Sequence, residues 1–463
     1  MSVCFINIGI HTFNRKKYPR HILPPMDIGY AAAVLDKEGF KTHFIDLEIE
    51  KKNSKSISSF LKKENINVLI IKSDIQVIKQ ALDLIRKIKG KRKAIAMGPS
   101  MTLLPELFIN KKSPIDIGIR YEPEYVLGYV LKSIKEGKDC YNLRGIVYLD
   151  KKIIINPKRS LINNLDKLPF PKHEFFLNKN YSFYYPTSVR RKQRLGFVLT
   201  SRGCPYSCAF CSPIKRNSYD KRYRQRSVEN IIKELLFLKK KGITMVYFRD
   251  DLFNWNKDFI LEFSKEMVKQ KVGLSWAAQC RADLLDEEQT KIMKSAGCVC
   301  INTGIESASD RALKKINKKT TIKRISRGIK AAKRAGINVV GCFILGLPGD
   351  TSKGMERSIK YSKKLGLDML QVLTFVNYPT KYKRQANIKN AFKDYEYYLA
   401  SKSYCGVSVD KLKELYIRFY KEFYLRPSYI LRYLYKNVLS LIINYQNSKA
   451  LLVQSSNILL KRL

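Results

Sequence analysis

The sequence predicts an α/β protein with three parts: a doubly wound parallel-sheet (Rossmann-like) domain, a partial (β/α)6 barrel of the TIM type, and a helical C-terminal appendage. Three observations support this prediction. Short apolar runs alternate with amphipathic runs over residues 1–140, the alternation recurs six times over residues 195–380, and the last part is rich in Tyr, Leu and Lys. We expect divisions at residues 1–140, 141–190 (a connector), 191–385 and 386–463.

The N-terminal part contains five short apolar runs of the kind that form strands in a parallel sheet. Helix-like stretches lie between them, notably at residues 28–38 and 75–88, each closed by a glycine suited to a left-handed C-cap. Ligands of doubly wound folds bind beyond the carboxyl ends of the strands. Residues 9–13, 46–48 and 98–102 should therefore frame any pocket. The expected strands are residues 3–8, 41–46, 68–72, 94–98 and 115–120.

The barrel is predicted from six units, each an apolar strand followed by a longer amphipathic segment. Catalytic groups in barrels of this kind gather at the carboxyl ends of the strands. The expected strands are residues 196–200, 245–248, 275–279, 299–304, 339–345 and 369–375, and the helices begin near Ser227, Lys257, Asp286, Thr320, Thr351 and Tyr382.

The C-terminal part shows apolar and aromatic residues at helical spacing over residues 412–427, interrupted by Pro427. Packing on the barrel is the simpler interpretation of these helices. Basic, aromatic helices also suit contact with a membrane surface or the wall of a substrate pocket, and the sequence does not separate these interpretations.

Composition favours a folded protein of the reducing cytoplasm. The 463 residues are 45% hydrophobic, and the N-terminus lacks the features of a signal peptide. The net charge of +48 does not by itself indicate a nucleic-acid partner, because lysine is spread over nearly every helix-like segment. Four of the ten cysteines are expected as inert thiols within apolar strands: Cys280, Cys298, Cys300 and Cys342.

The most informative motif is the triplet Cys204, Cys208 and Cys211, which follows the apolar run at residues 195–199. Three thiolates leave one iron of a four-iron cluster open for chemistry, whereas four would close it. A zinc site would need a fourth Cys or His nearby, and a disulfide loop does not suit a chain without a secretion signal.

The spacing of this triplet, with Phe210 before its last cysteine, resembles the radical S-adenosylmethionine (SAM) superfamily. The resemblance implies a 4Fe-4S cluster whose fourth iron is chelated by SAM, and a reductant such as flavodoxin or ferredoxin. It places Asp250 or Asp251 near the SAM amino group, Arg281 near its carboxylate, Glu306 near its ribose, and Phe210 with Gly346 around its adenine. Each residue also has a structural interpretation: the aspartates as helix caps, Arg281 as an ion-pair partner, Gly346 as a turn.

Residues 24–35, 98–102 and 118–124 resemble the cobalamin-binding domain that precedes many radical SAM modules. No DxHxxG motif is present, and Ser100 stands where many relatives carry histidine. The resemblance therefore implies cobalamin without a protein imidazole below the cobalt, and a pocket that has lost the cofactor stays open as an alternative. The four histidines, expected as surface or capping residues, are His11, His21, His43 and His173.

The resemblance implies an enzyme that cleaves SAM to a 5'-deoxyadenosyl radical and methylates an unactivated carbon of a small molecule. Ring closure or rearrangement is an alternative, as is a non-catalytic iron-sulfur protein for electron transfer or nucleic-acid binding. An RNA methylthiotransferase would need three N-terminal cysteines, and this part has only Cys4 and Cys140. The family's Tyr-Pro-Gly-Thr turn is replaced by residues 378–381, a departure from the family on the substrate side of the barrel.

Overall fold

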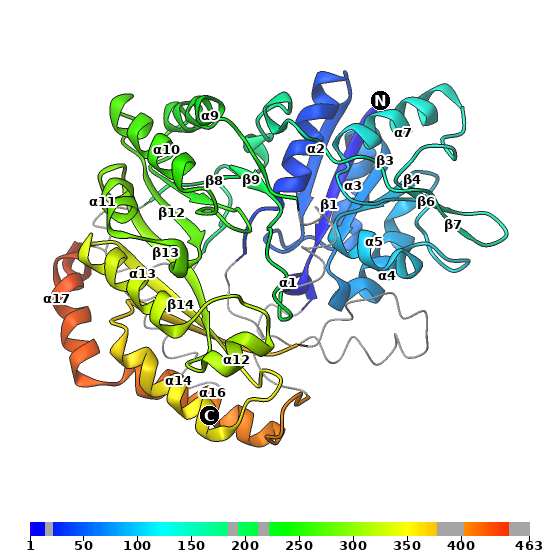
Figure 1. The fold of residues 1–463 in the computed structure, drawn as a ribbon. Coiled ribbons are helices and arrows are strands. Elements are labelled where there is room, and N and C mark those ends of the chain that lie inside the picture. The colour runs from blue at the N-terminus through cyan, green and yellow to red at the C-terminus, as the bar shows by residue number, and fades with distance from the viewer. Residues whose placement is uncertain (14–21, 184–192, 212–221, 377–401, 444–463) are drawn as a thin grey trace.

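The computed structural model describes residues 1–13, 22–183, 193–211, 222–376 and 402–443. Figure 1 shows the N-terminal sheet in blue and cyan on one side and the second sheet, in green and yellow, on the other. The C-terminal helices lie at the outer edge of the second sheet, away from the N-terminal one. The expected turn at residues 378–381 and the helix beginning near Tyr382 fall outside the described residues.

The N-terminal sheet has seven strands in the order β2-β1-β3-β4-β5-β6-β7. Strands β1 to β5 are parallel and follow the 2-1-3-4-5 order of one doubly wound class, whose switch point lies between β1 and β3. The prediction of a doubly wound sheet is confirmed. Strands β6 and β7 add an antiparallel hairpin, so the sheet runs beyond residue 140 into the expected connector. The strands are β1 Ser2–Ile8, β2 Lys41–Asp46, β3 Ile66–Ser73, β4 Lys93–Met97, β5 Ile117–Ile119, β6 Ile146–Leu149 and β7 Ile153–Ile155.

Helices cover both faces of this sheet because successive residues of its buried strands point to opposite faces. On β1, Val3 and Phe5 pack with α2 (Met26–Lys37) and α7 (Glu124–Glu136). Alternate residues of β1 pack on the other face with α3 (Ser54–Lys63) and α4 (Ile78–Lys89). Gly39, after α2, has φ +81°, the left-handed conformation expected of it. Short helices complete the part: α1 Ile10–Phe13, α5 Pro99–Leu103 and α6 Pro105–Phe108.

The second sheet contains six parallel strands in chain order, β8-β11-β12-β13-β14-β15. This arrangement confirms the predicted partial barrel. Its helices begin close to the residues expected from the sequence, and Ser227, Asp286 and Thr351 accept backbone hydrogen bonds at N-caps. The strands are β8 Leu195–Val198, β11 Met245–Phe248, β12 Ser275–Cys280, β13 Cys298–Glu306, β14 Asn338–Leu345 and β15 Met369–Thr374; the helices are α9 Val228–Lys240, α10 Lys257–Lys269, α11 Glu287–Ser295, α12 Asp310–Lys315, α13 Ile322–Arg334 and α14 Ser352–Lys364.

The connector joins the two parts through an apolar cluster. Phe183 stacks on Tyr247 of β11 with ring centroids 4.2 Å apart. Tyr181 packs edge-on against Phe197 of β8, and its hydroxyl donates to Asp46 at the end of β2. The two sheets are therefore held together by shared packing.

The tyrosines of the C-terminal part bond to the outer strand of the barrel. The hydroxyls of Tyr420 and Tyr424, on α16 (Val409–Tyr424), accept from the backbone N–H of Val372 and Leu370 at 3.0 and 2.9 Å. In α17 (Pro427–Ile443), the Tyr429 hydroxyl donates to a carbonyl at the start of β15. Packing on the barrel is thus confirmed for α16. No helix in the described ranges is long and apolar enough to cross a membrane.

Candidate functional site

The cysteine loop lies at the carboxyl edge of the barrel, as predicted. After β8 the chain forms β9 (Ser201–Arg202), which pairs with β10 (Arg224–Gln225), and turns at Gly203 with φ +89°. The N–H of Ala209 then donates to the carbonyl of Ile316, tying the loop to the end of α12. The loop is therefore anchored at both sides of its first two cysteines.

The three cysteine thiols of the loop differ in burial. Cys208 is buried, and Cys204 and Cys211 are half-buried. In the part of the chain that the structure describes, no three Cys, His, Asp or Glu side chains gather closely enough to hold one metal ion. The ligand geometry of a four-iron cluster differs from that of a single ion, because each of three irons takes its own thiolate and the sulfurs need not converge on one point.

Burial and nearby cations act in opposite directions on the thiols of the loop. Burial raises the pKa of Cys204 and Cys208, whereas the positive charge of Arg281 acts on both thiols in the opposite direction. Lys318 also lowers the pKa of Cys208. These cations therefore offset part of the cost of burying thiolates, although the net effect still raises the pKa of both cysteines.

The two candidate aspartates have different surroundings. Asp250 is buried, and its Oδ1 accepts from the Thr200 N–H at 3.0 Å, the Thr200 hydroxyl at 2.8 Å and the Ser201 hydroxyl at 2.5 Å. Burial raises the pKa of Asp250 to about 6, although these hydrogen bonds oppose the shift. Asp250 therefore fastens the end of β11 to β9. The charge of Asp251 instead acts on Cys204, which makes Asp251 the better candidate for a ligand contact.

Arg281 meets the cysteine loop but is already paired. Its guanidinium donates to both carboxylate oxygens of Asp283, at 3.1 and 2.8 Å, and to the Lys318 carbonyl at 2.8 Å. The same group lies 3.8 Å from the centroid of the Tyr206 ring, within the loop. Asn254 fixes the Arg281 backbone through two hydrogen bonds. The ion pair anticipated as the structural interpretation is present, and it holds Arg281 against the loop.

Glu306 and Phe210 come together through a lysine. Glu306 is a buried residue at an irregularity of β13. Its backbone φ is +66°, a value that residues other than glycine rarely adopt. Its carboxylate accepts from Lys318 Nζ at 2.6 Å, and that ammonium lies 5.4 Å from the Phe210 ring centroid. A Cβ at Gly304 would lie 2.0 Å from the Glu306 carboxylate, so glycine there leaves room for this group.

Gly346 turns toward the C-terminal helices. It has φ +74°, and a Cβ there would meet Leu412 of α16 at 3.3 Å and the sulfur of Cys405 at 3.9 Å. The turn anticipated from the sequence is present. Its contact with an adenine stays a prediction.

A buried ionic network joins the cysteine loop to the N-terminal sheet. Arg202, two residues before Cys204, donates to Glu122 at 3.0 Å and to Glu124 at 2.6 Å. Arg224 donates to Glu122 at 2.8 Å. All four side chains are at most 7% exposed. Because both glutamates follow β5, the carboxyl ends of the two sheets lie together.

Carboxylates occupy part of the carboxyl edge of the N-terminal sheet. Burial, with the nearby charges of Asp74 and Asp46, raises the pKa of Glu48 to about 8. Farther along the edge, Gly98 has φ +96° and lies beside the ion pair between Lys72 and Asp27.

The carboxyl edge of the N-terminal sheet offers no imidazole at residues 98–102, the stretch that resembles a cobalamin-binding domain. A Cβ at Gly98 would lie 3.3 Å from the Lys72 side chain, whose ion pair with Asp27 borders this position, and a buried Ser100 follows it. His11, in α1, is buried rather than on the surface, and so is His173, which pairs with Glu234 at 2.7 Å. The expectation of a surface position is wrong for these two histidines, which are only 6% and 2% exposed. Of the four cysteines expected to be buried, Cys342 is half-buried.

Sequence reasoning missed Lys318 and Asn254. Lys318 is one of 88 Lys and Arg residues, and only its burial beside Glu306 distinguishes it. Asn254 follows the predicted strand end closely, which is the one signal that could have identified it.

The model of the radical SAM superfamily matches residues 198–361. An uncharacterized methyltransferase of Pyrococcus horikoshii is 31% identical over 362 residues, covering 77% of this chain and 76% of that protein. The anaerobic magnesium-protoporphyrin IX monomethyl ester cyclase of Rubrivivax gelatinosus is 24% identical over 77% of this chain and 65% of that protein.

Among solved structures, the radical SAM methyltransferase TsrM of Kitasatospora setae is similar, with a TM-score of 0.67 and 17% identity. The match covers 82% of this chain and 74% of that one. TsrM has also been solved with cobalamin and a [4Fe-4S] cluster bound. At this identity the comparison establishes the shared fold.

Proposed function

This chain belongs to the radical SAM superfamily, and on that premise we propose that it is a cobalamin-dependent methyltransferase acting on an unactivated carbon of a small molecule. SAM and a 4Fe-4S cluster are the cofactors of that superfamily, and the cluster needs an external reductant. The proposal assigns the cluster to Cys204, Cys208 and Cys211. It is supported by the methyltransferase name of the relative that is 31% identical.

The observation that carries the proposal is the buried network of Arg202 and Arg224 with Glu122 and Glu124. It holds the cysteine loop against the residues that follow β5. A ligand at the carboxyl edge of the N-terminal sheet would therefore border the barrel mouth, the carboxyl edge of the barrel where the cysteine loop lies. Transfer of a group between two bound molecules requires this closeness.

We assign each candidate residue of the barrel mouth a role in binding SAM. When bound, the reduced cluster supplies the electron that cleaves SAM, and cobalamin supplies the methyl group. Asp251 would bind the SAM amino group, and Arg281 with Lys318 would provide cations for its carboxylate. Glu306 would bind the ribose, and Phe210 would cover the adenine. Apolar packing by the connector would keep water from the barrel interior.

Ring closure is the second candidate, favoured by the 24% identity with a tetrapyrrole cyclase. The two reactions differ in their use of SAM. Methyl transfer releases S-adenosylhomocysteine when the methyl carrier is reloaded, whereas ring closure does not.

The test is anaerobic purification and cluster reconstitution, followed by incubation with SAM, a reductant and hydroxocobalamin. We expect bound cobalt in a one-to-one ratio, with both 5'-deoxyadenosine and S-adenosylhomocysteine formed. Cys208→Ala should abolish both products. Cys280→Ala is the matched control, because Cys280 is buried in β12 outside the loop, and it should keep both.

Cleavage of SAM to 5'-deoxyadenosine without bound cobalt would contradict the cobalamin part of the proposal. The absence of any cleavage, with iron incorporated, would contradict the enzymatic part and favour a non-catalytic iron-sulfur protein.

A further inference from the structure

The outer face of α17 is an uncovered apolar stripe. Tyr429 and Tyr433 of this helix pack toward the barrel core. Leu431 is 68% exposed and Tyr435 is 89% exposed. Exposed residues at positions i, i+1, i+4 and i+5 share one face of a helix, opposite the packed tyrosines. The stripe consists of Ile430, Leu431, Leu434 and Tyr435.

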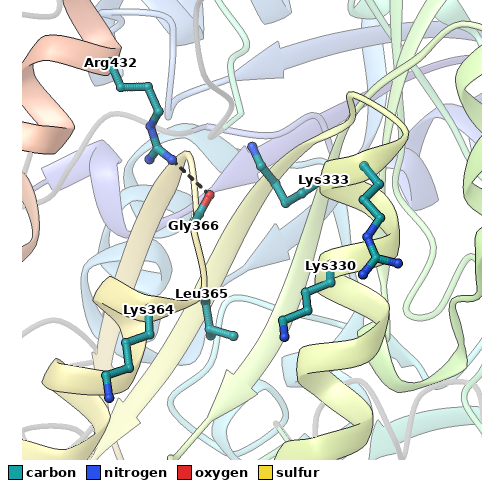
Figure 2. Close-up of a pocket in the computed structure, with 7 residues that line it drawn as sticks. Lys330, Lys333, Lys364, Leu365, Gly366 and Arg432 are labelled. Carbon is teal, nitrogen blue, oxygen red and sulfur yellow. Dashed lines mark hydrogen bonds between the residues drawn. The ribbon is translucent and has the colours of Figure 1, made fainter.

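A basic groove borders this stripe. Figure 2 shows Lys330 and Lys333 reaching the groove from α13, Lys364 from α14 and Arg432 from α17. Its volume is about 350 Å³, and its lining includes no acidic side chain. Because Arg432 belongs to α17, the groove and the apolar stripe meet on that helix.

The cationic side chains of the groove differ in whether they have hydrogen-bond or ion-pair partners. Arg432 donates to the carbonyls of Gly366 and Leu367, at 3.3 and 2.6 Å, and Lys333 is paired with Asp368. Lys330 and Lys364 have no hydrogen-bond or ion-pair partner among the residues the structure describes. The groove therefore presents at least two uncompensated positive charges beside an apolar helix face.

We propose that the α17 stripe and this groove dock the protein on an anionic lipid bilayer. An apolar helix face flanked by cations matches the boundary between acyl chains and anionic headgroups. The net charge of +48 adds long-range attraction to such a surface. Since no helix in the described part can span a bilayer, the contact would be interfacial. This inference does not depend on the proposed chemistry, because it uses no residue of the barrel mouth.

The geometry also fixes an orientation. The groove lies where α13 and α14 end, and in a parallel barrel the helices end at the amino ends of the strands. The cysteine loop lies at the opposite end. Docking would thus leave the barrel mouth turned away from the bilayer.

The experiment is co-sedimentation of the full chain with vesicles of phosphatidylcholine, with and without phosphatidylglycerol. We expect partitioning only where the anionic lipid is present. Lys330→Gln with Lys364→Gln should weaken it by about fivefold for each lysine. Leu431→Ser with Leu434→Ser should weaken it by about fivefold for each leucine.

Matched controls lie outside this surface. Lys111→Gln with Lys112→Gln removes two exposed charges from the N-terminal part, and Val268→Ser removes an exposed apolar side chain from α10. Both should partition as the unaltered protein does. Equal losses in the control and groove variants would overturn the proposal, since attraction would then be spread over the whole surface. The proposal would also be overturned if the protein were a dimer without vesicles and the leucine substitutions made it monomeric. The stripe would then be the contact with a second copy of the chain.

Discussion

Neutralising Glu124 should loosen the cysteine loop from the N-terminal sheet. Its Oε1 accepts from Arg202 at 2.6 Å, and its side chain is fully buried. The network holds two arginines and two glutamates, so its charges balance. Glu124→Gln would leave one buried positive charge uncompensated, because Glu122 is already shared between both arginines.

The expected cost follows from the burial. Removing one partner of a buried ion pair costs about 3–5 kcal/mol. Glutamine keeps an oxygen that can accept from Arg202, so we expect the lower end, about 3 kcal/mol of the free energy of unfolding. Because Arg202 lies two residues before Cys204, we also expect less iron to be incorporated.

Urea unfolding of the apoprotein provides the measurement. Circular dichroism monitors the whole chain, and fluorescence monitors Trp255 and Trp276 of the barrel. Glu136→Gln, on the exposed side of the same helix, should leave both readouts unchanged. A double-mutant cycle with Arg202→Leu separates the pair interaction from the cost of an unpaired charge. A loss below about 1 kcal/mol with full iron content would refute the reasoning, because buried pairs cost more when broken.

Three further predictions concern other parts of the molecule. Asp251→Asn should weaken SAM binding by about 10- to 100-fold with iron content retained, since a charge-assisted hydrogen bond contributes about 1.5–3 kcal/mol; calorimetric titration measures it, and unchanged affinity would remove Asp251 from the site. The folded pKa of Glu48 is raised from 4.5 to about 8, so the stability tied to its protonated form is complete below pH 4.5 and is lost as the pH rises from 4.5 through 8. Unfolding curves from about pH 4 to 9 should show that loss, and Glu48→Gln should flatten it; a loss of the same size in the variant would contradict the assignment. Tyr420→Phe and Tyr424→Phe should each lower the free energy of unfolding by about 1–3 kcal/mol, because each leaves a backbone N–H of β15 unpaired; Tyr435→Phe, on the exposed face of α17, is the control.

The barrel was predictable because its signals are local. Apolar runs mark its strands within a few residues, and Ser227 and Asp286 are side chains that cap helices wherever they precede an amphipathic run. The hairpin of β6 and β7 was not predicted, because nothing local shows that a short apolar segment will pair antiparallel at the edge of a parallel sheet.

The candidate site was predictable in place but not in detail. The cysteine loop follows its strand as expected, yet sequence could not choose between Asp250 and Asp251. That choice depends on which carboxylate meets Thr200 and Ser201 after folding. Similarly, the partner of Glu306 is twelve residues away, across α12, and a lysine in so basic a chain carries no signal of its own.

The tyrosines that bond to β15 have a consequence for protein synthesis. The ribosome completes β15 before α16, so for a time the outermost strand has open hydrogen-bonding groups and no cover. An uncovered strand edge readily pairs with strands of other chains. Chains that terminate before residue 409 should therefore aggregate as they leave the ribosome, and co-expressing the missing helix as a separate peptide should keep part of them in solution.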